Sequence, residues 1–283
     1  MRSLALAAVV VLFVLSPAGC KDQGKESAKR ALEDVDALAD QVAKDVAEVE
    51  RGLPEGAKKM SAVYAKNADP HTDVPSVRQA LLRSQREVPD LNIAKSTFFA
   101  LVDDKGVAIR NNLEQDAMAG QDLFKLFPDL SKALAGSYVS TMGSFGGKTA
   151  NGPDRDWVAA IPVVDDTGKV RGLFVTGWAL RAYCNHLSAE WKRRQAELAR
   201  ASGDTGKLPV FYVGVFDKTG VYTASMTPAV NEKAMADVGL VDKTASGTFS
   251  GTMNLTDRDF GYAAKRTPKL GPDTGVVVLR SEL

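Results

Sequence analysis

The sequence is poor in the residues that carry metal and redox chemistry. Its 283 residues include two cysteines and two histidines, His71 and His186. These are too few for a typical structural zinc site, and no Cys-x-x-Cys-His run is present for covalent haem attachment. The sequence therefore predicts neither a bound metal nor a cofactor.

An excess of charge of either sign is also missing. The 36 basic and 35 acidic residues give a formal net charge of +1, so no overall basic field favours nucleic acid. The chain has no nucleophile elbow, no Walker loop and no paired-carboxylate motif, which argues against an enzyme. Its 45% hydrophobic and 25% charged residues are typical of a globular chain with one large or two small domains.

Only one long apolar run is present, and it lies at the N-terminus. After Met1 and Arg2, residues 4–15 are almost wholly apolar, and the small residues up to Cys20 follow. The run is shorter than the roughly 20 residues that cross a bilayer, so it predicts a signal peptide over residues 1–19.

The end of this segment resembles the lipobox of bacterial lipoproteins. Ala18-Gly19-Cys20 carries the resemblance, although Pro17 stands where that family usually has leucine. The resemblance implies a lipid-modified Cys20 as the mature N-terminus, and Lys21 is similar to the context that sorts lipoproteins to the outer membrane. The alternative is ordinary signal peptidase cleavage after Ala18, which would release a soluble protein. A lipidated Cys20 leaves Cys184 as the only thiol.

A heptad pattern follows the cysteine. Apolar residues recur at alternating spacings of four and three, with charged residues between them, and Gly52, Pro54 and Gly56 predict the end of the helix. Two interpretations stay open for this N-terminal helical stalk over residues 20–73: a coiled coil, or a helix that packs on the core of its own domain. The seam consists of Ala28, Leu32, Val35, Ala39, Val42, Val46, Val49 and Leu53. A second helix is expected over residues 74–87.

The remaining sequence contains an internal duplication. Residues 98–110 predict a β-hairpin with Asp103 and Gly106 at its turn, and residues 210–223 repeat it with Asp217 and Gly220. Both aspartates are expected to form turns. The runs 135–142 and 154–157 then match 246–253 and 257–260 in the same order. Such a duplication predicts two similar units.

The predicted fold is α+β, with two tandem five-stranded antiparallel sheets, a long N-terminal helix and a connecting helix. The first unit comprises residues 74–179, the connecting helix 180–206, and the second unit 207–283.

This order of elements resembles the double-Cache layout of PAS-like extracytoplasmic sensors. The residues that carry the resemblance are 99–106, 120–123 and 161–175. It implies a small extracellular ligand bound in the first unit. Such tandems usually continue through a transmembrane helix into a signalling domain, so we expect this chain to need a separate transmembrane receptor or envelope protein as partner.

Between Met142 and Asp154 the first unit has eight more residues than the second unit has between the matching Met253 and Asp257. This longer stretch is rich in glycine. This loop is either a lid over a ligand or a tolerated surface insertion. Aromatic side chains can form the walls of a pocket for a small polar ligand, and an arginine can bind the carboxylate of such a ligand. The candidate ligand-binding residues are Arg110, Tyr138, Phe145, Arg155, Trp157 and Trp178. Core packing is the alternative for the tryptophans, and a structural turn for Arg155.

Two functions remain open from the sequence. The first is a lipid-anchored protein of the bacterial envelope that senses or binds a small molecule at the periplasmic face of a membrane. The second is a structural or protein-interaction lipoprotein of the envelope without a small ligand.

The anchor has a direct test. We expect Cys20→Ala to move the protein from the membrane fraction to the soluble fraction of a cell lysate, because the acylated sulfur is lost. Persistence of the variant in the membrane fraction would show that lipidation does not hold the protein there.

Overall fold

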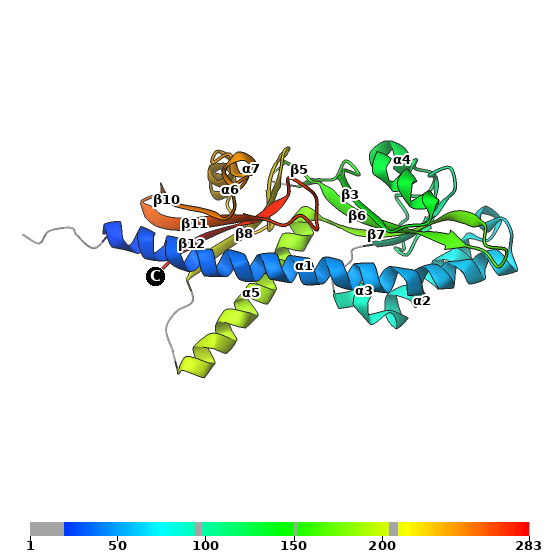
Figure 1. Cartoon of the computed structure of the whole chain (residues 1–283), viewed down its shortest axis with the longest axis horizontal. Helices are drawn as coiled ribbons and strands as arrows, with labels where there is room; N and C mark the ends of the chain where they lie inside the picture. The colour runs from blue at the N-terminus through cyan, green and yellow to red at the C-terminus, as the bar shows by residue number, and fades with distance from the viewer. Residues whose placement is uncertain (1–19, 94–97, 150–151, 204–208, 283) are drawn as a thin grey trace, which may run out of the picture.

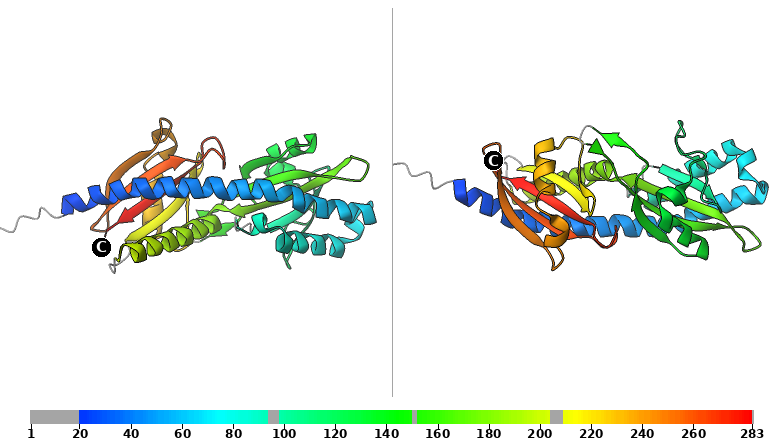
Figure 2. Two further views of the ribbon diagram at one scale, coloured as in Figure 1. Left: turned by 60° about the horizontal axis from the view of Figure 1, so that its bottom comes forward. Right: turned by 90° about the horizontal axis from the view of Figure 1, so that it is seen from above.

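A computed structural model describes residues 20–93, 98–149, 152–203 and 209–282. The predicted signal peptide lies outside these ranges. The longest element is the helix α1, Cys20–Lys66, which runs along one face of both sheets (Figures 1 and 2). Val35, Val42, Val49 and Leu53 of the heptad seam are fully buried. The seam therefore packs on the chain's own core, as the second interpretation predicted.

The predicted end of this helix is wrong, because α1 continues through Pro54 to Lys66. A proline inside a helix costs about 3 kcal/mol. Burial of Leu53 and Met60 on either side of it offsets this cost. The two glycines serve close packing: a Cβ on Gly52 would lie 2.9 Å from Leu91, and one on Gly56 2.1 Å from the ring of Phe174.

The first unit contains a five-stranded antiparallel sheet in the order β2-β1-β7-β6-β3. A 3₁₀ turn, η1, and the helices α2 and α3 lead into it, and the predicted helix over residues 74–87 is confirmed as α2. The elements are η1 Pro70–Thr72, α2 Val74–Glu87, α3 Pro89–Ile93, β1 Phe98–Asp103, β2 Ala108–Asn111, α4 Leu123–Leu126, η2 Pro128–Ala135, β3 Val139–Gly143, β4 Lys148–Thr149, β5 Gly152–Pro153, β6 Asp156–Val164 and β7 Val170–Ala179.

The second unit repeats this topology, since its sheet has the order β9-β8-β12-β11-β10. The duplication also holds at the level of register: Met142 pairs with Trp157 in the first sheet, and Met253 pairs with Phe260 in the second. The predicted fold of two tandem five-stranded sheets is confirmed. The remaining elements are α5 Leu180–Ser202, β8 Val210–Asp217, β9 Gly220–Thr223, α6 Ala229–Ala236, α7 Leu240–Lys243, β10 Phe249–Leu255, β11 Arg258–Arg266 and β12 Gly275–Ser281.

The two faces of each sheet are covered differently. A continuous apolar cluster packs α1 and α5 against one face of both sheets. The opposite face, here called the outer face, is covered by α4 and η2 in the first unit and by α6 and α7 in the second (Figure 1). Each outer face is therefore a separate, smaller core within one unit.

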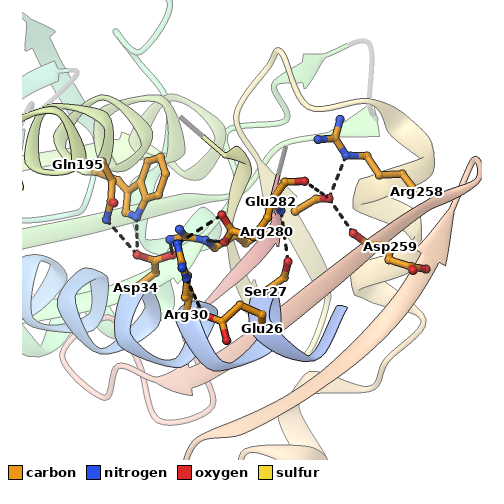
Figure 3. Close-up of polar contacts among 11 residues, drawn as sticks. Glu26, Ser27, Arg30, Asp34, Gln195, Arg258, Asp259, Arg280 and Glu282 are labelled. Atoms are coloured by element: carbon orange, nitrogen blue, oxygen red, sulfur yellow. Dashed lines mark hydrogen bonds and ion pairs between the residues drawn. The ribbon is translucent and has the colours of Figure 1, made fainter. Parts of the chain in front are cut away.

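A buried polar network fixes the C-terminal strand to the start of α1. Arg280 of β12 forms an ion pair of 2.6 Å with Asp34, and the indole nitrogen of Trp191 donates to the same carboxylate at 2.8 Å (Figure 3). Burial raises the pKa of Asp34, while hydrogen bonds from Arg280 and Trp191 act in the opposite direction. The network joins α1, α5 and β12 at one end of the molecule.

None of the helices in the described part of the chain combines the length and the apolar character that a membrane crossing requires.

The contact of α1 with the second sheet can be tested at Gly261 of β11. A Cβ at this position would lie 1.9 Å from the backbone nitrogen of Ala28, so Gly261→Ala must push the helix away. We expect a loss of about 2 kcal/mol or more in the free energy of unfolding, measured with urea.

The matched control is Gly147→Ala, because a Cβ on Gly147 meets nothing within 4 Å. We expect its effect to stay within about 0.5 kcal/mol. Equal stabilities of the two variants would contradict the close approach of α1 to β11.

Candidate ligand-binding site

Three of the candidate residues face the helix side of the first sheet. Trp157 and Trp178 are fully buried and stack with 4.2 Å between ring centroids. Tyr183 of α5 stacks on Trp178 at 4.4 Å. Tyr138 packs against the same cluster, and burial raises its pKa to about 12. These side chains occupy the core between the sheet, α1 and α5.

Phe145 lies on the outer face instead. Its ring packs edge-on against Phe98 at 5.5 Å and against Phe127 at 4.8 Å. It comes from the glycine-rich loop, of which the structure describes residues 143–149 and 152–155. The outer face of the first sheet is thus filled, at this point, by side chains of the protein itself.

A buried carboxylate holds this loop in place. Asp156 opens β6 on the same face as Val158, and one of its oxygens accepts a hydrogen bond from the backbone nitrogen of Phe145 at 2.9 Å. Burial raises the pKa of Asp156 to about 6, more than the hydrogen bond lowers it. Asp156 is not among the sequence-predicted residues, because its burial on the outer face depends on the loop that covers it.

Arg110 is tied into the loop that follows β2. Its guanidinium lies 2.9 Å from the Asp116 carboxylate and donates to the carbonyl of Leu113 at 2.8 Å. Burial would raise the pKa of Asp116, but hydrogen bonds from Asn111, Met118 and Arg110 outweigh it and lower the pKa. In this arrangement Arg110 stabilises the loop that follows β2.

Arg155 reaches from the first unit to the second. Its Nε lies 2.5 Å from an oxygen of Asp217, and the other oxygen of Asp217 accepts a hydrogen bond from the backbone nitrogen of Thr219. The aspartate therefore forms the β8–β9 turn, as predicted, and also holds the arginine. The six candidate residues do not converge on one point: three lie in the helix-side core, and Phe145, Arg110 and Arg155 lie at three other places.

A cavity of about 400 Å³ lies at this contact between the units. It combines hydroxyl, cationic and anionic side chains from both units, which suits a small polar ligand. We call it the junction cavity; its polar lining includes Thr141, Arg155, Asp217, Lys218 and Asp273. Arg155 is the sequence-predicted residue that lines it. The sequence could not pair Arg155 with Asp217, because 62 positions separate them.

A second ion pair nearby joins the connecting helix to the second unit. Arg181, at the start of α5, binds both carboxylate oxygens of Glu232 on α6. Burial would raise the pKa of Glu232, but the hydrogen bonds from Arg181 and Thr223 outweigh it and lower the pKa. The Arg155–Asp217 pair thus joins the two units, and the Arg181–Glu232 pair joins the connecting helix to the second unit.

The remaining reactive side chains have structural partners. Cys184 is fully buried, burial raises its pKa, and its sulfur donates to the carbonyl of Tyr222. His186 contacts Asp45 of α1 at 3.1 Å. Across the described residues, no three histidine, cysteine or acidic side chains are grouped so that they could hold a metal ion.

Comparisons with known proteins identify the fold. No family model and no curated protein matches the chain. Among solved structures, it is similar to the extracellular domain of a histidine kinase, with a TM-score of 0.55, 9% identity, and 93% of each chain covered. It is also similar to a domain of a sensory box/GGDEF family protein from Vibrio parahaemolyticus, with a TM-score of 0.53, 9% identity, and 92% of this chain and 97% of that chain covered.

A third similar structure is the sensory domain of a Campylobacter jejuni chemoreceptor with isoleucine bound. Its TM-score is 0.51 at 9% identity, with 94% of this chain and 97% of that chain covered. The fold of the chain is thus that of the Cache-like, PAS-like sensor domains of kinases and chemoreceptors, as the resemblance implied.

The buried Asp156 gives a prediction that depends on pH. Its carboxyl binds a proton more tightly in the folded state, with a pKa of about 6, than in the unfolded chain, at about 3.9. Its stabilising contribution is complete below about pH 4 and is lost as the pH rises through 6. Asp156→Asn keeps an oxygen for the Phe145 N–H and should add about 1–2 kcal/mol at pH 7.5, measured by urea unfolding.

At pH 4 the gain should fall to about 0.5 kcal/mol, because the wild-type carboxyl is then protonated in the folded state and about half protonated in the unfolded chain. The exposed Asp166→Asn is the control. An equal effect of Asp156→Asn at both pH values would contradict a buried carboxyl at this position.

Proposed function

We propose that the chain is a lipid-anchored sensor of the bacterial envelope that binds a small extracytoplasmic ligand and passes the signal to a separate partner. The observation that carries the proposal is the pair of PAS-like sheets built on one helix, an arrangement whose solved examples are sensor domains. One of those domains holds isoleucine. We propose no catalytic step and no cofactor.

The contact between the units supports this function. A ligand in the junction cavity would touch residues of both units, so its affinity would depend on how the units are placed relative to each other. Arg155 already holds a carboxylate there, that of Asp217. A ligand that exchanges with this carboxylate would alter the contact between the units, which is the change a sensor needs. Arg155 is therefore our first candidate for ligand contact, and the other five candidates remain proposals.

The opposite end of the second unit is suited to passing the change on. The start of α1 and the end of β12 lie together there, because the backbone nitrogen of Glu282 donates to Ser27 at 3.3 Å (Figure 3). Under the proposal, the lipid on Cys20 would hold this end at the membrane, with the outer membrane as the favoured site. A transmembrane receptor or envelope protein would contact the same end.

One observation favours the alternative, a structural envelope lipoprotein. Phe145, Phe98 and Phe127 fill part of the outer face of the first sheet, in the unit where the resemblance places a ligand. A protein without a ligand would need no more than this filled core and its exposed surfaces.

A thermal-shift screen separates the two functions. The panel contains amino acids, carboxylates, amines and purines, and a sensor should melt at a higher temperature with at least one of them. Binding adds about 2.7 kcal/mol at a ligand concentration 100 times Kd, which raises Tm by several degrees. Absence of any shift across the panel would favour the structural alternative.

Arg155→Ala tests the junction cavity with the compound that the screen identifies. We expect the shift to fall sharply, since the arginine's donors are lost. The control is Arg86→Ala, on the exposed side of α2. An unchanged shift in Arg155→Ala would show that the ligand does not bind in the junction cavity. Ligand binding itself would still be supported by the shift.

A further inference from the structure

The two units can be compared at the place where, in each unit, a short helix lies against the turn of the β-hairpin that opens the sheet. In the first unit, α4 faces the turn that ends at Gly106; in the second, α7 faces the turn that ends at Gly220. Both helices have four residues and begin with a buried leucine, Leu123 in α4 and Leu240 in α7. The residue after this leucine is Phe124 in α4 and Val241 in α7.

In the first unit this place is closed. The ring of Phe124 lies directly on the turn, since a Cβ on Gly106 would be 2.4 Å from it. The backbone nitrogen of Leu123 also donates to the carbonyl of Gly106 at 2.7 Å. An aromatic ring and a hydrogen bond thus seal α4 onto the hairpin.

In the second unit the same place is open. Val241 is smaller than phenylalanine, and a Cβ on Gly220 would meet nothing within 4 Å. A cavity of about 470 Å³ remains between the turn and α7, within the range of small-molecule sites. We call it the second-unit pocket. Its apolar lining includes Phe216, Val221, Leu240 and Val241.

The charged groups around the pocket differ in what they already bind. Asp217 is paired with Arg155 at 2.5 Å, and Lys218 is paired with Asp273 at 2.7 Å. Asp242 also lines the pocket, is exposed, and has no ion pair with any residue that the structure describes. The charged side chain that a ligand could bind at the edge of the pocket is therefore the carboxylate of Asp242.

We infer that the second-unit pocket binds a small molecule with a phenyl-sized ring and an ammonium group. The ring packs against Val221, Leu240 and Val241, and the ammonium group faces Asp242. Burial of a ring of this size supplies most of the affinity, and the exposed charge pair adds a smaller part. The inference rests on the proposed sensing function and adds a second ligand site, in the second unit, beside the junction cavity.

The test uses 2-phenylethylamine as the probe, with isothermal titration calorimetry on the full mature chain. Wild type should bind it, and phenylacetate, which carries the opposite charge, should bind more weakly. Val241→Phe fills the pocket with a ring of the protein itself, and should lower the affinity at least tenfold. Asp242→Asn should lower it roughly two- to fivefold, as expected for an exposed charge pair.

The matched controls are Val164→Phe, at an exposed valine of β6 in the first unit, and the exposed Asp166→Asn. Neither should change the affinity. Because Val241→Phe could also disturb folding, the methyl NMR signals of Val221 and Leu240 in wild type give a second measurement. They should shift during the titration, while those of Val102 and Leu123 should not.

Three outcomes overturn the inference: no binding of 2-phenylethylamine by wild type, full affinity in Val241→Phe, or methyl shifts confined to the first unit. If the probe does not bind but another compound of the panel raises Tm, the second-unit site fails and the sensing function stands. If no compound binds, both fail.

Discussion

The structure depends on the packing of one helix against two sheets. Along α1, buried residues recur from Ala31 to Tyr64, so a single apolar stripe serves both units. Each buried valine or leucine contributes about 1.5–3 kcal/mol, and the stripe therefore outweighs the proline within it. Small residues let the backbone come close where side chains would not fit, as Gly56 does at Phe174 and Gly261 at Ala28. Neither sheet can bury its helix-side face without α1, which makes the helix the element through which the two units affect each other.

The two units differ on the outer faces of their sheets, which lie opposite α1. The strand order is the same in both, and so is the register at the matched Met142 and Met253. The outer face of the first is closed by Phe124 and Phe145, and that of the second keeps a cavity beside Val241. The β8–β9 turn lines both the second-unit pocket and the junction cavity through Asp217 and Lys218. A ligand in the pocket would thus lie next to the ion pair that joins the units.

The sequence predicted the elements better than the site, for physical reasons. Hairpin turns with aspartate and glycine, and runs of apolar residues between them, depend on local geometry, and this is why the strands and α2 could be placed from the sequence. The continuation of α1 past Pro54 could not, because it depends on Phe174 and Leu91, which are distant in the sequence. The candidate site residues were chosen by type, yet alternation along β6 sends Trp157 to the helix side and Asp156 to the outer face. Likewise, a turn motif predicts that Asp217 forms a turn, but it does not predict the ion pair of Asp217 with Arg155.

Because α1 packs on both sheets, we expect the two units to form one cooperative body, so that a change in one unit affects the other. Differential scanning calorimetry of the mature chain tests this most directly. We expect a single transition whose van't Hoff enthalpy equals the calorimetric enthalpy, since loss of either sheet would expose part of the stripe on α1. Two separate transitions, one for each unit, would contradict it.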